Sequence, residues 1–387
     1  MGISGIVAEF NPLHNGHKYL IDCAKSNGNT VVCVISGNFV QRGDTAIVPK
    51  FVRAKMALEC GADIVVELQT PWAMSTAQNF AFGALSHLLA LGVDTLYFGS
   101  ESGNLDELLA VSKVLSSDKY NQLISTRIGS NLTFATLRSE IVSEILGYNT
   151  TVLENPNDTL AIEYISASKK LGANLKFVPV KRVGAGHNDN SSYGDFTNAT
   201  LLRKAVKDKQ HEFLYKYMPE CCAKLLLYSP VSSIEKLDTA IISRLKLCDK
   251  REFLSLPDIS EGIENLLYNG IRTANGYFEL VDTLKTKRYT HARLRRLVLS
   301  AFLGIDKKYF GTEPPYVRIL SFKKDSFINI ANSNIKPIIT RVSQIKELNE
   351  SAREIFDLEN KINEIYSLSL DRPEQFINEN TQKIIIK

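Results

Sequence analysis

The sequence predicts an α/β protein that begins with a parallel β-sheet domain, continues into a mainly helical region and ends in a small α/β part. Short segments of almost continuous apolar character recur through roughly the first 200 residues, as in strands buried on both faces of a sheet. Amphipathic segments with helical periodicity separate them. This alternation indicates βαβ units with right-handed crossovers.

Five strands and five intervening helices are predicted for the sheet domain. The strands are 3–9, 30–36, 63–68, 93–98 and 175–180, and the helices are 17–26, 50–60, 76–91, 104–117 and 159–171. Ligands of such sheets bind beyond the carboxyl ends of the strands, near the topological switch point. We therefore expect the loops after residues 9, 36, 98 and 180 to surround one site.

Three parts are predicted along the chain, at 1–210, 211–315 and 316–387. Strand patterns fade beyond residue 210, and residues 211–303 read as mostly helical. In the third part, YVRILSF and KPIIT read as strands, and a charged helix is expected near 343–366. The segment 184–196 is rich in Gly, Asn and Ser and is predicted to be a loop.

Composition places the chain among soluble globular proteins, with 44% hydrophobic and 23% charged residues. No apolar stretch is long enough for a membrane span, and no basic region precedes the first apolar segment as in a signal peptide. We therefore expect a cytoplasmic protein without a membrane partner. The net charge of +4 is only mildly basic, so a nucleic-acid partner requires a local patch of positive charge.

The chain has six cysteines, and their spacing does not indicate a metal site. They include no CxxC pair, and no histidine follows at zinc-ligand spacing. Several lie in apolar segments, so the interpretation is reduced core cysteines of a cytoplasmic protein. They are Cys23, Cys33, Cys60, Cys221, Cys222 and Cys248.

The segment 7–17, VAEFNPLHNGH, carries the clearest chemical signal. A strand ends, a turn containing Pro12 follows, and a helix begins at His14 and His17. Two histidines three positions apart lie on one helix face, where their ring donors can reach one phosphate group. The free N–H groups of the first turn and the helix dipole favour an anion at the same place. Gly16 removes a side chain where a flat ring approaches the backbone.

Alternative interpretations exist for each supporting feature. The histidine pair could bind a metal, but no third ligand is near in sequence. Arg42 and Lys50 belong to a basic segment that could clamp a triphosphate or form a solvated surface. Gly99 suits close approach of a nucleotide or an ordinary turn. Thr200 and Arg203, at a helix start, could grip phosphate or serve only as an N-terminal cap region.

Longer segments resemble, in order and spacing, the bacterial tRNA(Met) cytidine acetate ligase family, which belongs to the HxGH nucleotidyltransferase superfamily with a Rossmann-like sheet. The segments are VAEFNPLHNGHKYL, SGNFVQRGDTAIVPKFVRAKMAL, FGSE, ENPNDTLAIEYISA, VKRVGAGHND and LKTKRYTHARLRRLVLSAFLGI. The resemblance implies that ATP and acetate form acetyl-adenylate and pyrophosphate. The acetyl group then passes to the exocyclic amine of the wobble cytidine in the anticodon of elongator tRNA(Met).

The resemblance also implies an ATP site, with His14 and His17 as catalytic residues and Mg²⁺ accompanying the phosphates. Asn155 is an alternative to Asn157, and Arg42, Lys50, Thr200 and Arg203 are further possible phosphate contacts. The implied ATP-binding residues are Val7, Ala8, Glu9, Phe10, Asn11, Pro12, Leu13, His14, Asn15, Gly16, His17, Lys18, Tyr19, Leu20, Gly99, Asn157 and Arg182.

A basic segment at 285–296 is the predicted tRNA contact. It holds six Lys or Arg residues, one His and no acid, and Tyr289 and His291 are available for stacking on bases. A solvated helix face is the alternative. The predicted tRNA-binding residues are Lys285, Lys287, Arg288, Arg293, Arg295 and Arg296.

Two other functions are compatible with parts of the sequence. A small-molecule adenylyltransferase of the coenzyme A or NAD precursor type shares HxGH but has no use for the basic helical half. A non-catalytic RNA-binding protein needs neither the histidines nor Gly16. Chain length and the basic segment argue against the first, and the intact HxGH motif argues against the second.

Overall fold

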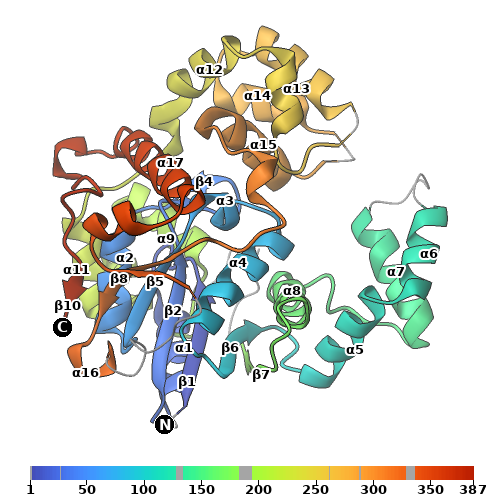
Figure 1. Ribbon diagram of the computed structural model, residues 1–387, viewed down its shortest axis with the longest axis horizontal. Coiled ribbons are helices and arrows are strands. Elements are labelled where there is room, and N and C mark those ends of the chain that lie inside the picture. Colours follow the sequence, from blue (N-terminus) through green and yellow to red (C-terminus); the bar gives the residue numbers. More distant parts are fainter. Residues whose placement is uncertain are drawn as a thin grey trace.

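One central sheet organises the molecule (Figure 1). The computed structural model describes residues 2–26, 28–127, 134–182, 194–260, 262–286, 289–327 and 336–387. Most of the predicted loop 184–196, together with Lys287 and Arg288, therefore lies outside the described residues. The sheet strands are β1 (Ile3–Ala8), β2 (Thr30–Ser36), β5 (Ile64–Leu68), β6 (Thr95–Ser100), β7 (Lys176–Lys181), β8 (Val317–Phe322), β9 (Ile338–Ile339) and β10 (Ile385–Ile386).

The strand order, β10-β8-β5-β2-β1-β6-β7 with β9 on β8, confirms the predicted parallel sheet. β1 pairs in parallel with both β2 and β6, β2 with β5, and β6 with β7. From β1 the chain winds outward in one direction through β2 and β5, and in the other through β6 and β7. The switch point therefore lies between β1 and β6, where a ligand site is expected.

Helices cover both faces of the sheet, and the side chains of β2 show why. Val32 and Val34 point to one face and join the apolar cluster with α4, α5 and α8, whereas Val31, Cys33 and Ile35 point to the other. The crossover helices lie close to their predicted positions. They are α1 (Asn15–Lys25), α2 (Lys50–Glu59), α4 (Ala77–Ala90), α5 (Leu105–Leu115) and α8 (Pro156–Lys170), with α3 (Thr70–Ala73), α6 (Asp118–Arg127) and α7 (Phe134–Leu146) between them.

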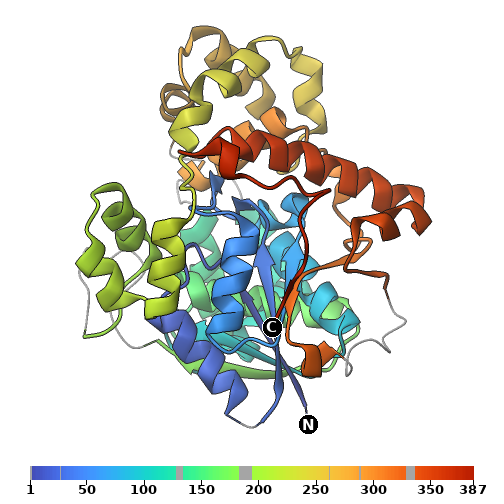
Figure 2. The same ribbon diagram turned by 90° about the vertical axis from the view of Figure 1, so that its left-hand side faces the viewer.

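The segment beyond residue 316 shares the central sheet. β8 runs antiparallel to β5, and β10 pairs in parallel with the outer side of β8. The charged helix predicted near 343–366 is α17 (Glu350–Ser367), which lies between the sheet and the helices α12–α15 (Figure 2). Leu358, Ile362 and Tyr366 of α17 pack into the apolar cluster of those helices.

Residues 211–303 are mostly helical, as predicted. Their helices are α10 (His211–Tyr217), α11 (Glu220–Tyr228), α12 (Asp238–Lys246), α13 (Ile263–Thr273), α14 (Tyr277–Leu284) and α15 (His291–Leu303), and α9 (Ala199–Lys207) precedes them. The chain also forms a short helix, α16 (Lys324–Phe327), and a small hairpin of β3 (Phe39–Val40) and β4 (Asp44–Thr45). Among the described helices, none is both long and apolar enough to cross a bilayer.

Candidate active site

A cavity of about 290 Å³ opens at the switch point, against the carboxyl ends of β1, β6 and β7. Most of the loops expected to surround one site contribute to it, together with the start of α8 and the segment before α9. The described lining residues are Val7, Ala8, Glu9, Phe10, Asn11, His14, Gly16, His17, Tyr19, Leu20, Gln41, Arg42, Ala77, Phe80, Gly99, Pro156, Asn157, Thr159, Leu160, Tyr164, Val180, Lys181, Arg182, Phe196, Thr197, Asn198 and Ala199.

His14 and His17 form one unit at the start of α1, as their spacing predicted. Their rings stack with centroids 3.8 Å apart, and Phe10 meets the ring of His17 edge-on. His14 is the N-cap residue, and its Nδ1 accepts a hydrogen bond from the backbone N–H of Gly16 at 3.1 Å. In return, Nδ1 of His17 accepts from the backbone N–H of His14 at 3.4 Å.

These backbone contacts determine which ring nitrogens carry protons. Because Nδ1 accepts a hydrogen bond in both rings, a neutral imidazole at either position carries its proton on Nε2. Burial, with the nearby charge of Arg182, lowers the pKa of His17 to about 3. His17 is therefore neutral near pH 7 in the ligand-free protein and presents an N–H donor rather than a positive charge.

Gly16 has the steric role expected of it. A Cβ atom at Gly16 would lie only 3.1 Å from Cε1 of His14, so a larger residue would displace that ring. The buried Arg53 fixes the adjoining backbone, because its guanidinium donates to the carbonyl of Glu9 at 2.8 Å and to that of Ser36 at 2.9 Å. The carboxyl ends of β1 and β2 are thereby held together beside the cavity.

Gly99, at the end of β6, leaves open space in the cavity. Among the described residues, a Cβ atom there would meet nothing closer than Cγ of Arg182, at 3.7 Å, which is ordinary van der Waals contact. That part of the protein therefore does not require a glycine at this position. Because Gly99 and Arg182 both line the cavity, the missing side chain leaves room for a ligand.

The start of α8 is fixed by carboxylates, and this geometry favours Asn157 over Asn155 as the cavity residue. Asn157 lines the cavity, and its Nδ2 donates to Glu101 Oε1 at 2.6 Å. Asn155 instead turns its Nδ2 to Asp158, at 3.0 Å. Asp158 is fully buried and also accepts hydrogen bonds from the Ser100 hydroxyl and the backbone of Ser102.

The segment before α9 contributes a residue that the sequence prediction missed. Thr197 is buried and lines the cavity, and its hydroxyl has no hydrogen-bond partner among the described residues. A buried hydroxyl without a partner costs free energy, so this one is suited to a ligand. Arg203 instead donates to the Asn11 carbonyl at 2.8 Å and to Thr200 Oγ1 at 3.1 Å, and neither Thr200 nor Arg203 lines the cavity.

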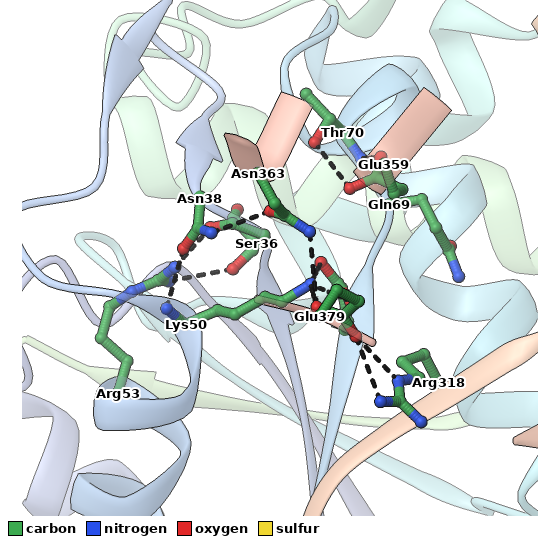
Figure 3. Close-up of polar contacts among 12 residues, drawn as sticks. Ser36, Asn38, Lys50, Arg53, Gln69, Thr70, Arg318, Glu359, Asn363 and Glu379 are labelled. Carbon is green, nitrogen blue, oxygen red and sulfur yellow. Dashed lines mark hydrogen bonds and ion pairs between the residues drawn. The ribbon is translucent and has the colours of Figure 1, made fainter. Parts of the chain in front are cut away.

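The position of Lys50 argues against the phosphate contact predicted for it. The side chain is 2% exposed, and its Nζ lies 2.7 Å from Glu67 and 2.8 Å from Glu379 in a buried polar network (Figure 3). Although burial alone would lower it, the carboxylates of Glu379 and Glu67 raise the pKa of Lys50. Lys50 is therefore a structural cation that joins the start of α2 to residues near the end of the chain. Arg42, by contrast, is exposed and lines the cavity.

The basic segment 285–296 is partly neutralised by an acid distant in sequence. Asp258 forms ion pairs with Arg293 at 3.5 Å and with Arg296 at 3.3 Å. Tyr289, expected to stack on bases, is buried, with the Arg293 guanidinium 5.0 Å from its ring centroid. The prediction that Tyr289 is available to stack on bases is wrong, because the tertiary fold covers its ring. The phosphate contacts predicted for the basic residues of this segment stay a prediction.

Several predicted ATP-binding residues do not line the cavity, and some of them contact other parts of the protein instead. Asn15 donates its Nδ2 to the Asp195 carbonyl at 3.0 Å and to the Lys216 carbonyl at 3.1 Å, which ties α1 to the segments around α9 and α10. Lys18 pairs with Asp22 on the same helix. The residues of the predicted set that do not line the cavity are Pro12, Leu13, Asn15 and Lys18.

A parallel sheet whose first strand runs into an HxGH helix start at the switch point defines a nucleotidyltransferase of the HxGH class. Comparison with known proteins agrees. Residues 1–381 match the model of the family described as HIGH Nucleotidyl Transferase. The tRNA(Met) cytidine acetate ligase of Thermoanaerobacter sp. (strain X514) is 36% identical, over 95% of this chain and 96% of that protein. The ligase of Clostridium perfringens (strain SM101 / Type A) is 35% identical, over 95% and 99%.

Solved structures show the same similarity to this group of proteins. Thermotoga maritima TmcAL in its apo form superposes with a TM-score of 0.93 at 30% identity, covering 100% of this chain and 99% of that one. The same protein bound with alpha-thio ATP gives a TM-score of 0.91 at 28% identity, with the same coverage. The chain therefore belongs to the tRNA(Met) cytidine acetate ligase family.

Proposed function

We propose that this enzyme is an ATP-dependent ligase that acetylates the exocyclic amine of the wobble cytidine in elongator tRNA(Met), with AMP and pyrophosphate as products. Relatives about 35% identical over nearly the whole chain carry the ligase name, and a similar structure is bound with an ATP analogue. The observation that carries the proposal is the histidine pair, with its Nε2 atoms as donors at the switch-point cavity.

The first step activates acetate. An acetate oxygen attacks the α-phosphorus of ATP, the bond from that phosphorus to the bridging oxygen breaks, and pyrophosphate leaves with the electron pair. The Nε2–H groups of His14 and His17 donate to the phosphate oxygens, and the positive end of the α1 dipole adds to the stabilisation. The exposed Arg42 and the cavity residue Arg182 supply positive charge for the leaving pyrophosphate.

The second step transfers the acetyl group. The cytidine amine is a weak nucleophile because its lone pair is delocalised into the ring, so it needs an acyl donor held close and away from water. The amine attacks the acetyl carbon, the bond from that carbon to the AMP oxygen breaks with its electron pair passing to AMP, and the amine proton passes to solvent water. A wobble base lies in a single-stranded loop, from which it can be turned out into a pocket.

Magnesium fits the cavity as a partner of the phosphates. Mg²⁺ in nucleotide sites takes one or two carboxylates together with phosphate oxygens and water. Glu9 is the carboxylate among the described lining residues, and its Oε1 accepts from the backbone N–H of Gln41 at 2.9 Å. Mg²⁺ held there would offset the negative charge of the pyrophosphate.

The tRNA is expected to approach over α15, beside the cavity. A Cβ atom at Gly43 would lie 2.7 Å from Cβ of Arg295, so α15 packs closely on the β3–β4 turn. Gln41 and Arg42, which belong to that turn, line the cavity. A phosphate backbone lying along Lys285 and Arg295 would therefore bring an unstacked base near the acetyl donor. The cytoplasm is the expected compartment, since it supplies ATP, acetate and tRNA.

Product analysis tests the proposal. The protein is incubated with ATP, labelled acetate and an elongator tRNA(Met) transcript, and the nucleosides are identified by mass spectrometry. Acetylcytidine at the wobble position, absent when that cytidine is replaced by uridine, supports the ligase function. AMP transfer to a phosphorylated small molecule would instead favour the adenylyltransferase. Binding of tRNA with no reaction would favour a non-catalytic RNA-binding protein.

A further inference from the structure

Three cysteines that are distant in sequence come together where α2 ends against α11. Cys60 is the C-cap residue of α2, and Cys221 and Cys222 lie in the first turn of α11. The Sγ atoms of Cys60 and Cys222 are 3.3 Å apart, those of Cys221 and Cys222 are 4.0 Å apart, and all three lie within 4.8 Å of one another. All three are free thiols.

We propose that Cys60, Cys221 and Cys222 form a binding site for a soft, thiophilic metal cation of the Zn²⁺, Cd²⁺ or Cu⁺ type. Thiolate sulfurs lie about 2.3 Å from Zn²⁺, so three of them around one ion in trigonal geometry are separated by roughly 4 Å. The Cys221–Cys222 separation of 4.0 Å already has that value. The closer Cys60–Cys222 pair needs to open by less than about 1 Å, which is a small side-chain rotation.

The chemistry of the cluster favours a soft ion over a hard one. No carboxylate or histidine belongs to this group in the part of the chain that the structure describes, and sulfur ligands select soft cations. Thiolates are the metal-binding form of cysteine, so metal binding displaces the thiol protons and the affinity should rise with pH.

The residues around the cysteine cluster determine how an ion could enter it and which helices the bound ion would join. Cys60 and Cys222 are buried, whereas Cys221 is partly exposed and gives an ion a route from solvent. A bound cation would crosslink α2 to α11. Because α2 also carries Arg53, whose guanidinium holds the Glu9 carbonyl beside the cavity, the metal would stabilise the helix that supports the active site.

Cadmium titration of the full-length protein tests the site. The metal-free protein is kept reduced with a non-thiol reductant, and Cd²⁺ is added in the presence of a weak competing chelator. We expect one equivalent to bind, with thiolate-to-cadmium charge-transfer absorption in the ultraviolet and a rise in Tm. Cys221→Ser, at the partly exposed position, should lower the affinity on the order of tenfold or more.

Matched variants separate the site from general thiol reactivity. Cys248→Ala removes a buried cysteine outside the cluster and should leave the affinity and the absorption band unchanged. The proposal is overturned if the reduced protein shows no charge-transfer band. Equal Cd²⁺ uptake by Cys221→Ser and the unaltered protein also overturns it. A third contrary result is a reduced protein that binds no Cd²⁺ but forms a Cys60–Cys222 disulfide on mild oxidation.

Discussion

Replacing Lys50 by Met distinguishes a structural cation from a phosphate ligand. Lys50 is 2% exposed, and its ammonium is bracketed by the carboxylates of Glu67 and Glu379, which are 3% and 4% exposed. Methionine has nearly the same length but no charge, so it would leave the buried carboxylate of Glu67 without its cation, whereas Glu379 keeps its ion pair with Arg318, at 3.1 Å. Removing one partner of a buried ion pair costs about 3–5 kcal/mol, because the remaining charge is uncompensated. We expect the free energy of unfolding to fall by about that amount.

Urea denaturation measures this loss of stability, and two further variants serve as an exposed-lysine control and as a rescue. Lys207→Met removes an exposed lysine whose pair with Glu235 lies in solvent, and it should change the free energy of unfolding far less. Adding Glu67→Gln to Lys50→Met removes the buried carboxylate that has lost its cation and should recover much of the lost stability. The folded Lys50→Met protein should bind ATP as the unaltered protein does. Unchanged stability together with a tenfold weaker ATP affinity would refute the structural assignment.

Four other changes test the cavity, the RNA surface and the histidine pair. Gly99→Ala should preserve stability, because its methyl group meets no atom of the described residues closely, but lower ATP affinity by about tenfold; equal affinity would remove Gly99 from the site. Thr197→Val removes a buried hydroxyl that has no hydrogen-bond partner among the described residues, so it should not destabilise the protein, yet it should weaken ATP binding roughly five- to tenfold, as isothermal titration would show. Replacing Lys285 and Arg295 by Ala should weaken tRNA binding and lower the slope of its salt dependence by about one to two, with ATP affinity unchanged; an unaltered slope would exclude phosphate contacts. Because burial lowers the pKa of His17 to about 3, the unfolded chain gains a proton there below its ordinary pKa of 6.5 while the folded protein does not. Stability should therefore fall by up to about 2 kcal/mol more in the unaltered protein than in His17→Asn as pH drops from about 6.5 to about 5, and parallel pH profiles would contradict this.

The sheet was predictable because its signal is local. Strands such as β2, with all seven residues buried, appear in the sequence as continuous apolar segments, and the helix start at His14 is indicated by the residues next to it. Ligands of parallel sheets bind beyond the carboxyl ends of the strands, so the loops after residues 9, 36, 98 and 180 could be expected around one site before the strand order was known. These features require only periodicity and the chirality of βαβ units.

The errors have a common physical cause, which is a partner far away in the chain. Lys50 has the sequence context of a phosphate-binding lysine, and only the fold brings Glu379 to it. Asp258 neutralises Arg293 and Arg296 in the same way. The cluster around Cys60 is equally invisible, because spacing rules detect metal sites only when ligands are close in sequence. Thr197, in contrast, was adjacent to a recognised helix start and could have been found.

Exchange of labelled pyrophosphate into ATP tests the central claim most directly, because it reports the reversible formation of an acyl-adenylate. We expect exchange that requires acetate, proceeds without tRNA, and falls on the order of a hundredfold in His17→Asn, as expected when one transition-state donor is lost. Exchange that ignores acetate but requires a phosphorylated acceptor would contradict the ligase assignment, and full exchange in His17→Asn would contradict the role of that histidine.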